Sequence, residues 1–451
     1  MIAPARVAAY EILRAVSAER ATLPAAITSA RAALNDDRDR ALAAEIATGV
    51  QRWRAALDYV ISAVAKRSID RLDPEVVEIL RLSAYQLLYL TRVPASAVVD
   101  DAVELTRRAG KRSAAGLVNA VLRSISRQKN ALPLPPRPTV GTDRPAAIDY
   151  LSIALSHPRW LVERWYDRYG FEATERSLRF NNQAAPLTLR ANPLRVSRDD
   201  LATRLASHDV HVKPGRFAPD ALVVERGHVL ATQDHGLFVV QDEASQLVAL
   251  LAGRPPGARV LDACASPGGK TTALSAAMGG RGILVACDVR ERRMDLLRRT
   301  VRTAGARNVR LLQADLLKPL PFRQPFDCVL VDAPCSGLGI LRRDPDIRWR
   351  RREDDLPALA AAQLVMLQRA SDVVAPGGRL VYATCSSEPE ENESVAAAFL
   401  ATTPAFSGVD LRREDKPVPS EVIDDSGHLR THPHLHGLEA FFGAVFERGS
   451  Q

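Results

Sequence analysis

The 451-residue sequence has no apolar run of about 18 or more residues and only five cysteines. Without such a run, no membrane-spanning helix is expected. The N-terminal stretch carries Arg6, Glu11 and Arg14 inside its apolar pattern and does not read as a signal peptide. The cysteines are odd in number and form no CxxC pair, which argues against a disulfide framework and a zinc site. We therefore expect a cytoplasmic protein with free thiols, no bound metal and no membrane partner.

The chain has more positively than negatively charged residues. The formal net charge is +8 and the isoelectric point is about 9.4. Such a balance favours an anionic partner, and nucleic acid before a membrane surface. A general bias toward arginine across the source proteome is the alternative, which charge alone does not exclude.

The first 129 residues contain few glycines and repeat apolar residues at helical spacing, as in VVEILRLSAYQLLYL (76–90). This predicts an all-helical domain over 1–129. The following NALPLPPRPTVGTDRP (130–145) is rich in proline and has no periodicity, so we expect an extended linker over 130–147.

Helix and strand patterns alternate over 148–235, which predicts a small α+β domain. The expected elements are a helix over 157–170 ended by Gly170, a strand over 186–194, a helix over 197–209 capped by Ser197 and a strand over 220–227.

Short apolar runs that end in polar residues follow in the last region, 236–451. They are ARVLDAC (258–264), GILVACD (282–288), VRLLQAD (309–315), FDCVLVDAP (326–334) and GRLVYATCS (378–386). Helical patterns lie between several of them, and this combination predicts an α/β domain with a parallel sheet covered on both faces. In such sheets ligands bind beyond the carboxyl ends of the strands.

The first of these strands runs into the glycine turn CASPGGKTT (264–272). A phosphate-binding P-loop is excluded because its first glycine would fall on Cys264, and the dinucleotide pattern GxGxxG is also absent. A turn for the methionine part of S-adenosylmethionine remains. Asp288 and Asp315 end the next two strands, where carboxylates suit the hydroxyl and amino donors of a nucleoside. Each aspartate could instead cap the helix that follows it.

Two cysteines lie just past strand ends, Cys335 in VDAPCSG (331–337) and Cys385 in YATCSSEPEENE (382–393). Addition of a thiolate to C6 of cytosine would make C5 nucleophilic enough to take a methyl group, after which the C5 proton must leave. A locally favoured thiolate is required. The alternative, a small buried residue, is favoured for the other cysteines, Cys264, Cys287 and Cys328. The spacing of the motifs does not decide whether Cys335 or Cys385 attacks C6.

Several motifs resemble those of a known family. CASPGGKTT, DAPCSG, RRDPDIRW (342–349), ATCS and PEEN resemble the motifs of the RNA cytosine-C5 methyltransferases of the Sun or Fmu group. EILRLSAYQLLYL (78–90) and LVNAVLR (117–123) are similar to the NusB-type RNA-binding domain, and HPRW, PLTLRAN and VVQDEASQLVA (239–249) to the family's middle region. Together they resemble the RsmB family, which methylates a cytosine of 16S ribosomal RNA.

The resemblance implies a NusB-like all-α domain (1–129), a small α+β RNA-binding region (148–235) and a Rossmann-like class I methyltransferase domain (236–451). It implies Cys385 as the nucleophile, Cys335 in release of the enzyme as or through the base at C5, and Asp332 at the cytosine edge. The implied S-adenosylmethionine site consists of Cys264, Ala265, Ser266, Pro267, Gly268, Gly269, Lys270, Asp288, Asp315 and Asp332. Lys270 could also approach the substrate.

The implied partner is 16S rRNA, bound by a monomer. The same chemistry on tRNA or another RNA stays open, as does an inactive RNA-binding assembly factor, although both cysteines and the acidic strand ends are present. The long basic N-terminal region disfavours a small-molecule methyltransferase.

Two groups of cations are candidates for contact with RNA. One surrounds Trp349 and consists of Arg342, Arg343, Arg348, Arg350, Arg351 and Arg352; arginine contacts phosphate and an aromatic ring can stack on a base. The other consists of Arg107, Arg108, Lys111, Arg112, Arg123 and Arg127. Solvated surfaces are the alternative for both groups.

The chain departs from the family pattern at two places and contains one cluster of histidines. The glycine turn has serine where the family usually has CAAPGGKT, and residues 439–442 read EAFF where the family often has DGFF. His428, His432, His434 and His436 cluster without acidic or cysteine partners at ligand spacing, and predict a loop rather than a metal site.

Overall fold

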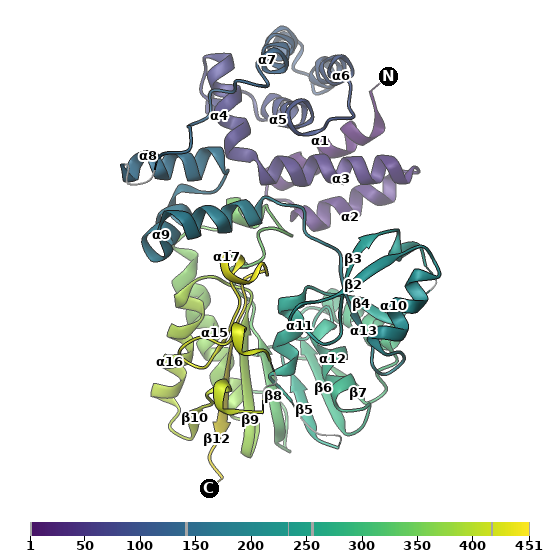
Figure 1. The fold of residues 1–451 in the computed structure, drawn as a ribbon, viewed down its shortest axis with the longest axis vertical. Helices are drawn as coiled ribbons and strands as arrows, with labels where there is room; N and C mark the ends of the chain where they lie inside the picture. Colours follow the sequence, from purple (N-terminus) through teal and green to yellow (C-terminus); the bar gives the residue numbers. More distant parts are fainter. Residues whose placement is uncertain (1, 140–142, 233, 254–256, 416–417, 451) are drawn as a thin grey trace. The chain divides into compact units, whose positions relative to one another are not determined.

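The computed structural model describes residues 2–139, 143–232, 234–253, 257–415 and 418–450. The chain divides into two compact units (Figure 1). The first contains the chain up to Gln183 together with the insert Leu341–Arg351, and the second contains Ala184–Ile340 and the chain from Arg352 onward. The predicted middle region, 148–235, is thus shared between the two units. Residues 140–142 of the predicted linker lie outside the described residues.

The first unit is helical. Its elements are α1 (Pro4–Ser17), α2 (Leu23–Ala33), α3 (Asp37–Arg52), α4 (Arg54–Ala65), η1 (Ile69–Arg71), α5 (Pro74–Tyr89), α6 (Ala95–Arg108), η2 (Arg112–Ala114), α7 (Ala115–Arg127), α8 (Arg144–Asp149), η3 (Tyr150–Ala154), α9 (Arg159–Asn181) and α14 (Ile347–Arg350). The helix predicted over 76–90 corresponds to α5, whose residues 76–86 are all buried. A helix that is buried on every side must be surrounded by other helices, and α1, α3, α4, α6 and α7 all contact it.

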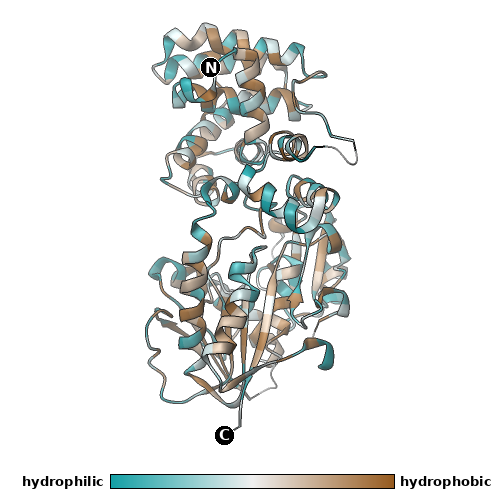
Figure 2. Ribbon diagram, turned by 90° about the vertical axis from the view of Figure 1, so that its left-hand side faces the viewer, coloured by the Kyte–Doolittle hydropathy of each residue, from teal (hydrophilic) through white to brown (hydrophobic). Residues whose placement is uncertain are grey.

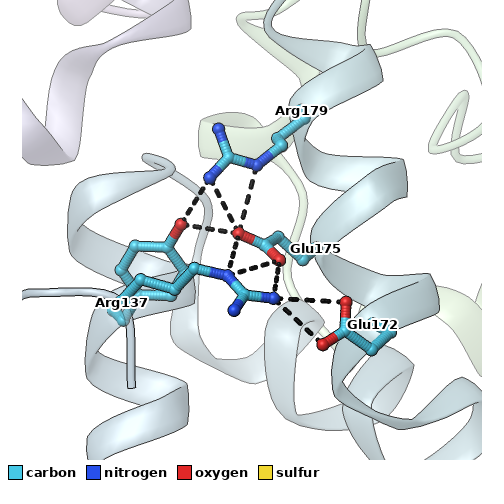
Figure 3. A network of polar contacts seen from close by, with 5 residues as sticks. Arg137, Glu172, Glu175 and Arg179 are labelled. Atoms are coloured by element: carbon cyan, nitrogen blue, oxygen red, sulfur yellow. Dashed lines mark hydrogen bonds and ion pairs between the residues drawn. The ribbon is translucent and has the colours of Figure 1, made fainter. Parts of the chain in front are cut away.

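The proline-rich segment is fixed to α9 by Arg137 (Figure 3). The guanidinium of Arg137 donates to Glu175 at 2.7 Å and to Glu172 at 3.0 Å, and Arg179 donates to Glu175 at 2.8 Å. Burial alone would raise the pKa of Glu175, but the hydrogen bonds from Arg137, Tyr150 and Arg179 lower it to about 2. The helix α8 begins at Arg144, inside the predicted linker.

Gly170 breaks α9, as the sequence predicts, but a second helical stretch continues to Asn181. Its φ of +76° lies in the left-handed region that favours glycine. The break therefore changes the direction of the chain without ending the helical region.

The insert Leu341–Arg351 belongs to the helical unit, although it lies between two strands of the second unit in sequence. Arg348 is completely buried and donates to the carbonyl oxygen of Ser156 and the side chain of Asn182, both at 3.0 Å. The indole of Trp349 donates to the carbonyl oxygen of Gln51 at 2.6 Å. The expectation that Arg348 faces RNA is therefore wrong. Its guanidinium donates to acceptors inside the helical unit. Burial lowers the pKa of Arg348 well below its ordinary value.

The second cationic group is mostly exposed, in contrast to the buried Arg348. Arg107, Arg108, Arg112, Arg123 and Arg127 are exposed on α6, η2 and α7. Lys111 lies 3.2 Å from Asp73 and 3.7 Å from Glu75. Contact of this group with RNA stays a prediction.

The second unit begins with a small antiparallel sheet in the order β2-β3-β1-β4. The elements are β1 (Thr188–Ala191), α10 (Arg198–Ala206), β2 (His211–Pro214), β3 (Ala221–Arg226), η4 (Val229–Ala231), β4 (Phe238–Val240) and α11 (Glu243–Leu250). The predicted cap is confirmed, because the Ser197 hydroxyl accepts a hydrogen bond from the Asp200 amide at 3.1 Å. β2 and β4 were not predicted.

A larger sheet follows, in the order β10-β12-β9-β8-β5-β6-β7, with β11 paired to β12. Its elements are β5 (Arg259–Asp262), α12 (Gly269–Ala277), β6 (Ile283–Asp288), α13 (Glu291–Ala304), β7 (Val309–Gln313), β8 (Phe326–Asp332), α15 (Asp355–Ser371), β9 (Val374–Thr384), η5 (Pro389–Glu391), α16 (Glu393–Thr402), β10 (Phe406–Gly408), η6 (Leu411–Arg413), η7 (Ser420–Val422), β11 (Leu429–Arg430), α17 (Pro433–His436) and β12 (Phe442–Arg448). The strands are largely hydrophobic in Figure 2. Alternate residues of β5, β6, β8 and β9 enter two separate cores, one on each face of the sheet.

The prediction of a parallel sheet is confirmed for the five predicted strands, β5 to β9, whereas β10, β11 and β12 were not predicted and form antiparallel pairs. Phe442, at the start of β12, pairs with Thr384, at the end of β9. A strand that enters the sheet at the edge where its neighbour leaves must run back along it, so β12 is antiparallel. None of the helices in the described ranges combines the length and apolar character needed to cross a bilayer.

Candidate active site

The candidate site lies at the carboxyl ends of the parallel strands. β5 is central, with β6 and β7 on one side and β8 and β9 on the other. The chain therefore changes direction between β5 and β8, which is where open α/β sheets form a ligand crevice. Asp262, Asp288 and Asp332 are the last residues of β5, β6 and β8, and Cys385 directly follows β9.

The glycine turn after β5 is fixed by its neighbour β6. The amide of Ala265 donates to the carbonyl oxygen of Cys287 at 2.8 Å, and the amide of Ser266 donates to Asp288 at 3.2 Å. Gly268 has a φ of +104°, and a Cβ there would lie 2.9 Å from the Leu297 side chain. Asp288 therefore stabilises the glycine turn through a hydrogen bond. This role differs from the helix cap that the sequence left open as an alternative.

Asp315 contrasts with Asp288. It follows β7, one strand further from the switch point, and accepts a hydrogen bond from the Leu317 amide at 3.0 Å. That bond is the local cap of a turn. A role for Asp315 in cofactor binding stays a prediction.

Asp262 is a site residue that the sequence reading did not select. It is completely buried under the turn, where one oxygen accepts a hydrogen bond from Thr271 at 2.6 Å and the other oxygen has no partner. Burial raises its pKa to about 7, against the lowering effect of the Thr271 bond. Its position at the end of the first strand was the signal that could have identified it.

Lys270 and Asp332 form an ion pair with 2.7 Å between Nζ and Oδ2. The Lys270 Nζ also lies 5.6 Å from the centre of the Phe441 ring, within the departing EAFF segment. Burial alone would lower the pKa of Lys270, but the charge and hydrogen bond of Asp332, with a contribution from Cys385, raise it. The lysine is therefore a cation within electrostatic reach of the thiols.

Cys335 and Cys385 are in direct contact, with 3.3 Å between their Sγ atoms. Both are half-buried, whereas Cys287 and Cys328 are buried in the core as expected. The hydrogen bond with Cys385, followed by burial, raises the pKa of Cys335 well above its ordinary value. This shift disfavours the thiolate form of Cys335.

A cleft runs beside these groups. Its lining consists of Val239, Val240, Gln241, Ser245, Ala265, Ser266, Pro267, Gly269, Lys270, Thr300 and Asp332. The small sheet therefore supplies one wall through β4 and the start of α11, and the glycine turn supplies the other. Cys264 is half-buried beside the turn, and burial raises its pKa well above the ordinary value.

Arg190 links the small sheet to the glycine turn and was also missed by the sequence reading. From β1 its guanidinium donates to the Gly269 carbonyl oxygen at 2.5 Å, to the Thr272 hydroxyl at 2.7 Å and to the Gln241 side chain. It is 4% exposed, and burial lowers its pKa to about 10.

Comparison with known proteins agrees with this architecture. A family model described as 16S rRNA methyltransferase RsmB/F matches residues 249–447, the NusB family matches 3–127, and the RsmF/B-like ferredoxin-like domain matches 157–230. The ribosomal RNA small subunit methyltransferase B of Pseudomonas putida is 35% identical over 414 residues, which cover 91% of this chain and 92% of the relative. The chain belongs to the RsmB/F methyltransferase family.

Further members and solved structures support the assignment to RsmB/F. The ribosomal RNA small subunit methyltransferase B of Xanthomonas campestris is 35% identical over 404 residues, or 88% of each chain. The crystal structure of PH0851 has a TM-score of 0.80 at 26% identity and covers 99% of both chains. A methyltransferase homolog from Pyrococcus horikoshii has a TM-score of 0.59 at 27% identity and covers 68% of this chain and 100% of its own. This RsmB/F member is therefore an S-adenosylmethionine-dependent RNA methyltransferase.

The histidine cluster, predicted to be a loop, is helical in part. His434 and His436 lie on the short helix α17, and the rings of His432 and His434 are 5.2 Å apart. Within the described ranges, no group of three or more His, Cys, Asp or Glu side chains could hold a metal ion.

Proposed function

We propose that the protein transfers a methyl group to C5 of a cytosine in 16S rRNA, with Cys385 as the covalent nucleophile. The observation that carries the proposal is the contact between two thiols at the carboxyl ends of β8 and β9, close to the Lys270–Asp332 ion pair. We choose rRNA as the substrate because the relatives are named ribosomal RNA small subunit methyltransferases. The domain boundaries at 129, 147 and 235 and a monomeric state belong to the same proposal.

The covalent step needs one thiolate and one proton acceptor. The Cys385 sulfur forms a bond to C6, and the electron pair of the C5–C6 double bond becomes available to form the new C5–methyl bond. The proton on C5 then leaves, the double bond reforms and the S–C6 bond breaks, which releases the enzyme. S-adenosylmethionine, when bound, supplies the methyl group as an electrophile.

The two thiols differ in a way that supports this division of roles. The raised pKa of Cys335 disfavours its thiolate, and a hydrogen bond across the 3.3 Å contact would stabilise negative charge on the Cys385 sulfur. Cys385 is therefore the better candidate for the thiolate. Cys335 would act later, as the base at C5 or through another base.

Asp332 would hold the edge of the target base. Its Oδ2 atom is bonded to Lys270, so its position is fixed before substrate arrives. A carboxylate accepts hydrogen bonds, and the exocyclic amino group of cytosine donates them. Lys270 would add positive charge near the site of attack.

The residues at the glycine turn fit S-adenosylmethionine. The buried carboxyl of Asp262, with one oxygen unpartnered beneath the turn, would favour the positively charged methionine part through its charge. Residues 264–270 would supply backbone contacts, and Asp288 and Asp315 would accept hydrogen bonds from the nucleoside. Asp332 borders both the turn and the base site.

The test is a methylation assay on unmodified 16S rRNA with labelled S-adenosylmethionine, followed by mapping of the label. We expect 5-methylcytosine at one position of 16S rRNA. Label that maps only to tRNA would overturn the substrate while preserving the chemistry. Binding of RNA without 5-methylcytosine on any RNA tested would favour an inactive assembly factor and overturn the enzymatic proposal.

A further inference from the structure

A network of buried polar side chains lies beneath the thiol pair, and the mechanism above does not use it. At its centre is Glu391, the last residue of η5 and part of the PEEN motif. Glu391 is completely buried. A buried carboxylate is costly unless hydrogen bonds hold it, so its partners identify what it stabilises.

The carboxylate bridges the two loops that carry the cysteines. The amide of Ser336 donates to Oε1 of Glu391 at 2.7 Å, and the hydroxyl of Ser386 donates to Oε2 at 2.5 Å. The two serine hydroxyl oxygens lie 3.1 Å apart. Because Ser386 gives its only hydroxyl proton to Glu391, the Ser336 hydroxyl must donate to Ser386, which closes a ring of hydrogen bonds.

Two further side chains hold Glu391 in place. The Gln363 amide donates to Oε1 of Glu391 at 2.9 Å and to the carbonyl oxygen of Pro334 at 3.0 Å. The Tyr382 hydroxyl donates to the Glu391 carbonyl oxygen at 2.5 Å. Gln363, Tyr382, Ser336 and Ser386 are all at most 2% exposed. The carboxylate accepts every bond that its oxygens make here, as an ionised group does.

The geometry relates this clamp directly to the reacting atoms. Ser336 immediately follows Cys335, and Ser386 immediately follows Cys385. A group that binds both serines therefore fixes the distance between the cysteines that precede them.

We infer that Glu391 is a positioning residue for the reaction, and that its carboxylate clamps Ser336 and Ser386 so that Cys335 and Cys385 stay in contact. The inference rests on the proposed function for the roles of the two thiols. It assigns Glu391 no contact with RNA or with the methyl donor.

The clamp also has an electrostatic consequence. After the hydrogen bond from Cys385 and burial, the negative charge of Glu391 contributes to the raised pKa of Cys335. Cys385 and Tyr382 also lie near Cys335, and burial raises the pKa of Tyr382 well above its ordinary value. Removal of the Glu391 charge should therefore lower the pKa of Cys335 and move the limb of the pH–rate profile that reports this thiol to lower pH.

The experiment compares Glu391→Gln with wild type and with Asp372→Asn, which removes one exposed carboxylate at the end of the helix that carries Gln363. Phenylarsine oxide binds two adjacent thiols together with loss of water, so its rate of capture reports the Cys335–Cys385 contact without RNA or methyl transfer. Cys335→Ala and Cys385→Ala calibrate the loss of capture.

We expect Glu391→Gln to slow capture by about tenfold or more and to lower kcat by about 10- to 100-fold, with KM for RNA within about threefold. Its pH–rate profile should shift as described, while Asp372→Asn behaves as wild type. Capture at the wild-type rate together with an unmoved pH profile would overturn the inference. Absence of methylation in wild type, with capture still sensitive to Glu391, would instead overturn the proposed function alone.

A second variant, Ser386→Ala, tests the clamp if Glu391→Gln does not fold. Ser386→Ala removes one bond of the clamp and leaves Glu391 in place. We expect it to slow capture by a smaller factor than Glu391→Gln, and unchanged capture in a folded Ser386→Ala protein would count against the clamp.

Discussion

The Sγ atoms of Cys335 and Cys385 lie 3.3 Å apart, although the two residues are separated by 50 positions in the chain. β8 and β9 are adjacent and parallel, with Asp332 paired to Ala383, so the loops after them leave the sheet side by side. The contact is a product of strand order, and it places one thiol where it can donate a proton to the other.

Replacement of each cysteine should separate attack from release. Cys385→Ala should form neither product nor covalent adduct, because no sulfur can reach C6. Cys335→Ala should attack but release slowly, so we expect an RNA adduct on denaturing gels and turnover reduced by about 100-fold or more. Cys287→Ala, which removes a thiol from the core, serves as the control and should keep turnover. Full activity of Cys385→Ala would overturn the assignment of the nucleophile.

Neutralisation of Asp332 should weaken both stability and catalysis. Asp332→Asn leaves the largely buried Lys270 without its counter-ion, and the pKa of Lys270 should fall because Asp332 is what raises it. We expect the free energy of unfolding in urea to fall by about 1–3 kcal/mol and kcat by at least about tenfold. Asp295→Asn, at an exposed pair, should change stability by less than about 0.5 kcal/mol. Equal behaviour of the two variants would contradict the role of Asp332.

Asp262 should make stability fall as pH rises. Its pKa is about 7 in the folded protein and near 4 in an unfolded chain, so the folded state binds the extra proton in between. Stability is fully present below about pH 4 and declines toward about pH 7. Between those limits the free energy of unfolding of wild type should drop by about 2–4 kcal/mol relative to Asp262→Asn.

The measurement for Asp262 is urea denaturation of both proteins across this pH range, with binding of S-adenosylmethionine followed by calorimetry. Asp262→Asn keeps an oxygen for the Thr271 hydroxyl but loses the charge, and we expect it to bind the cofactor about tenfold or more weakly. Parallel pH curves for the two proteins would show that Asp262 is not the titrating group.

Arg190 should set the position of the glycine turn from the neighbouring sheet. Lysine keeps the charge but has one side-chain nitrogen, whereas Arg190 bonds Gln241 and the Gly269 carbonyl through Nη1 and the Thr272 hydroxyl through Nη2. We expect Arg190→Lys to lose about 2–4 kcal/mol in urea denaturation and to bind S-adenosylmethionine about tenfold more weakly. Arg226→Lys, whose side chain is 69% exposed, is the matched control and should stay within about 0.5 kcal/mol of wild type.

The sequence alone predicted the elements with the strongest local patterns. The five parallel strands appear where apolar runs of four to eight residues were bounded by turn signals, and α5 appears where apolar residues recur at helical spacing. The antiparallel β12 was not foreseen, because its direction depends on where the chain re-enters the sheet and not on its own residues.

The position of the thiols past two strand ends, and the acidic strand ends beside them, also followed from the sequence, because parallel strands deliver their carboxyl ends to one edge. Only the tertiary structure decided which groups touch. It set the two sulfurs in contact, paired Lys270 with Asp332 and placed Arg348 inside the helical unit instead of on a surface. It also gathered Glu391, Ser336 and Ser386 into one clamp. Such contacts join residues distant in sequence, and periodicity and local propensity carry no information about them.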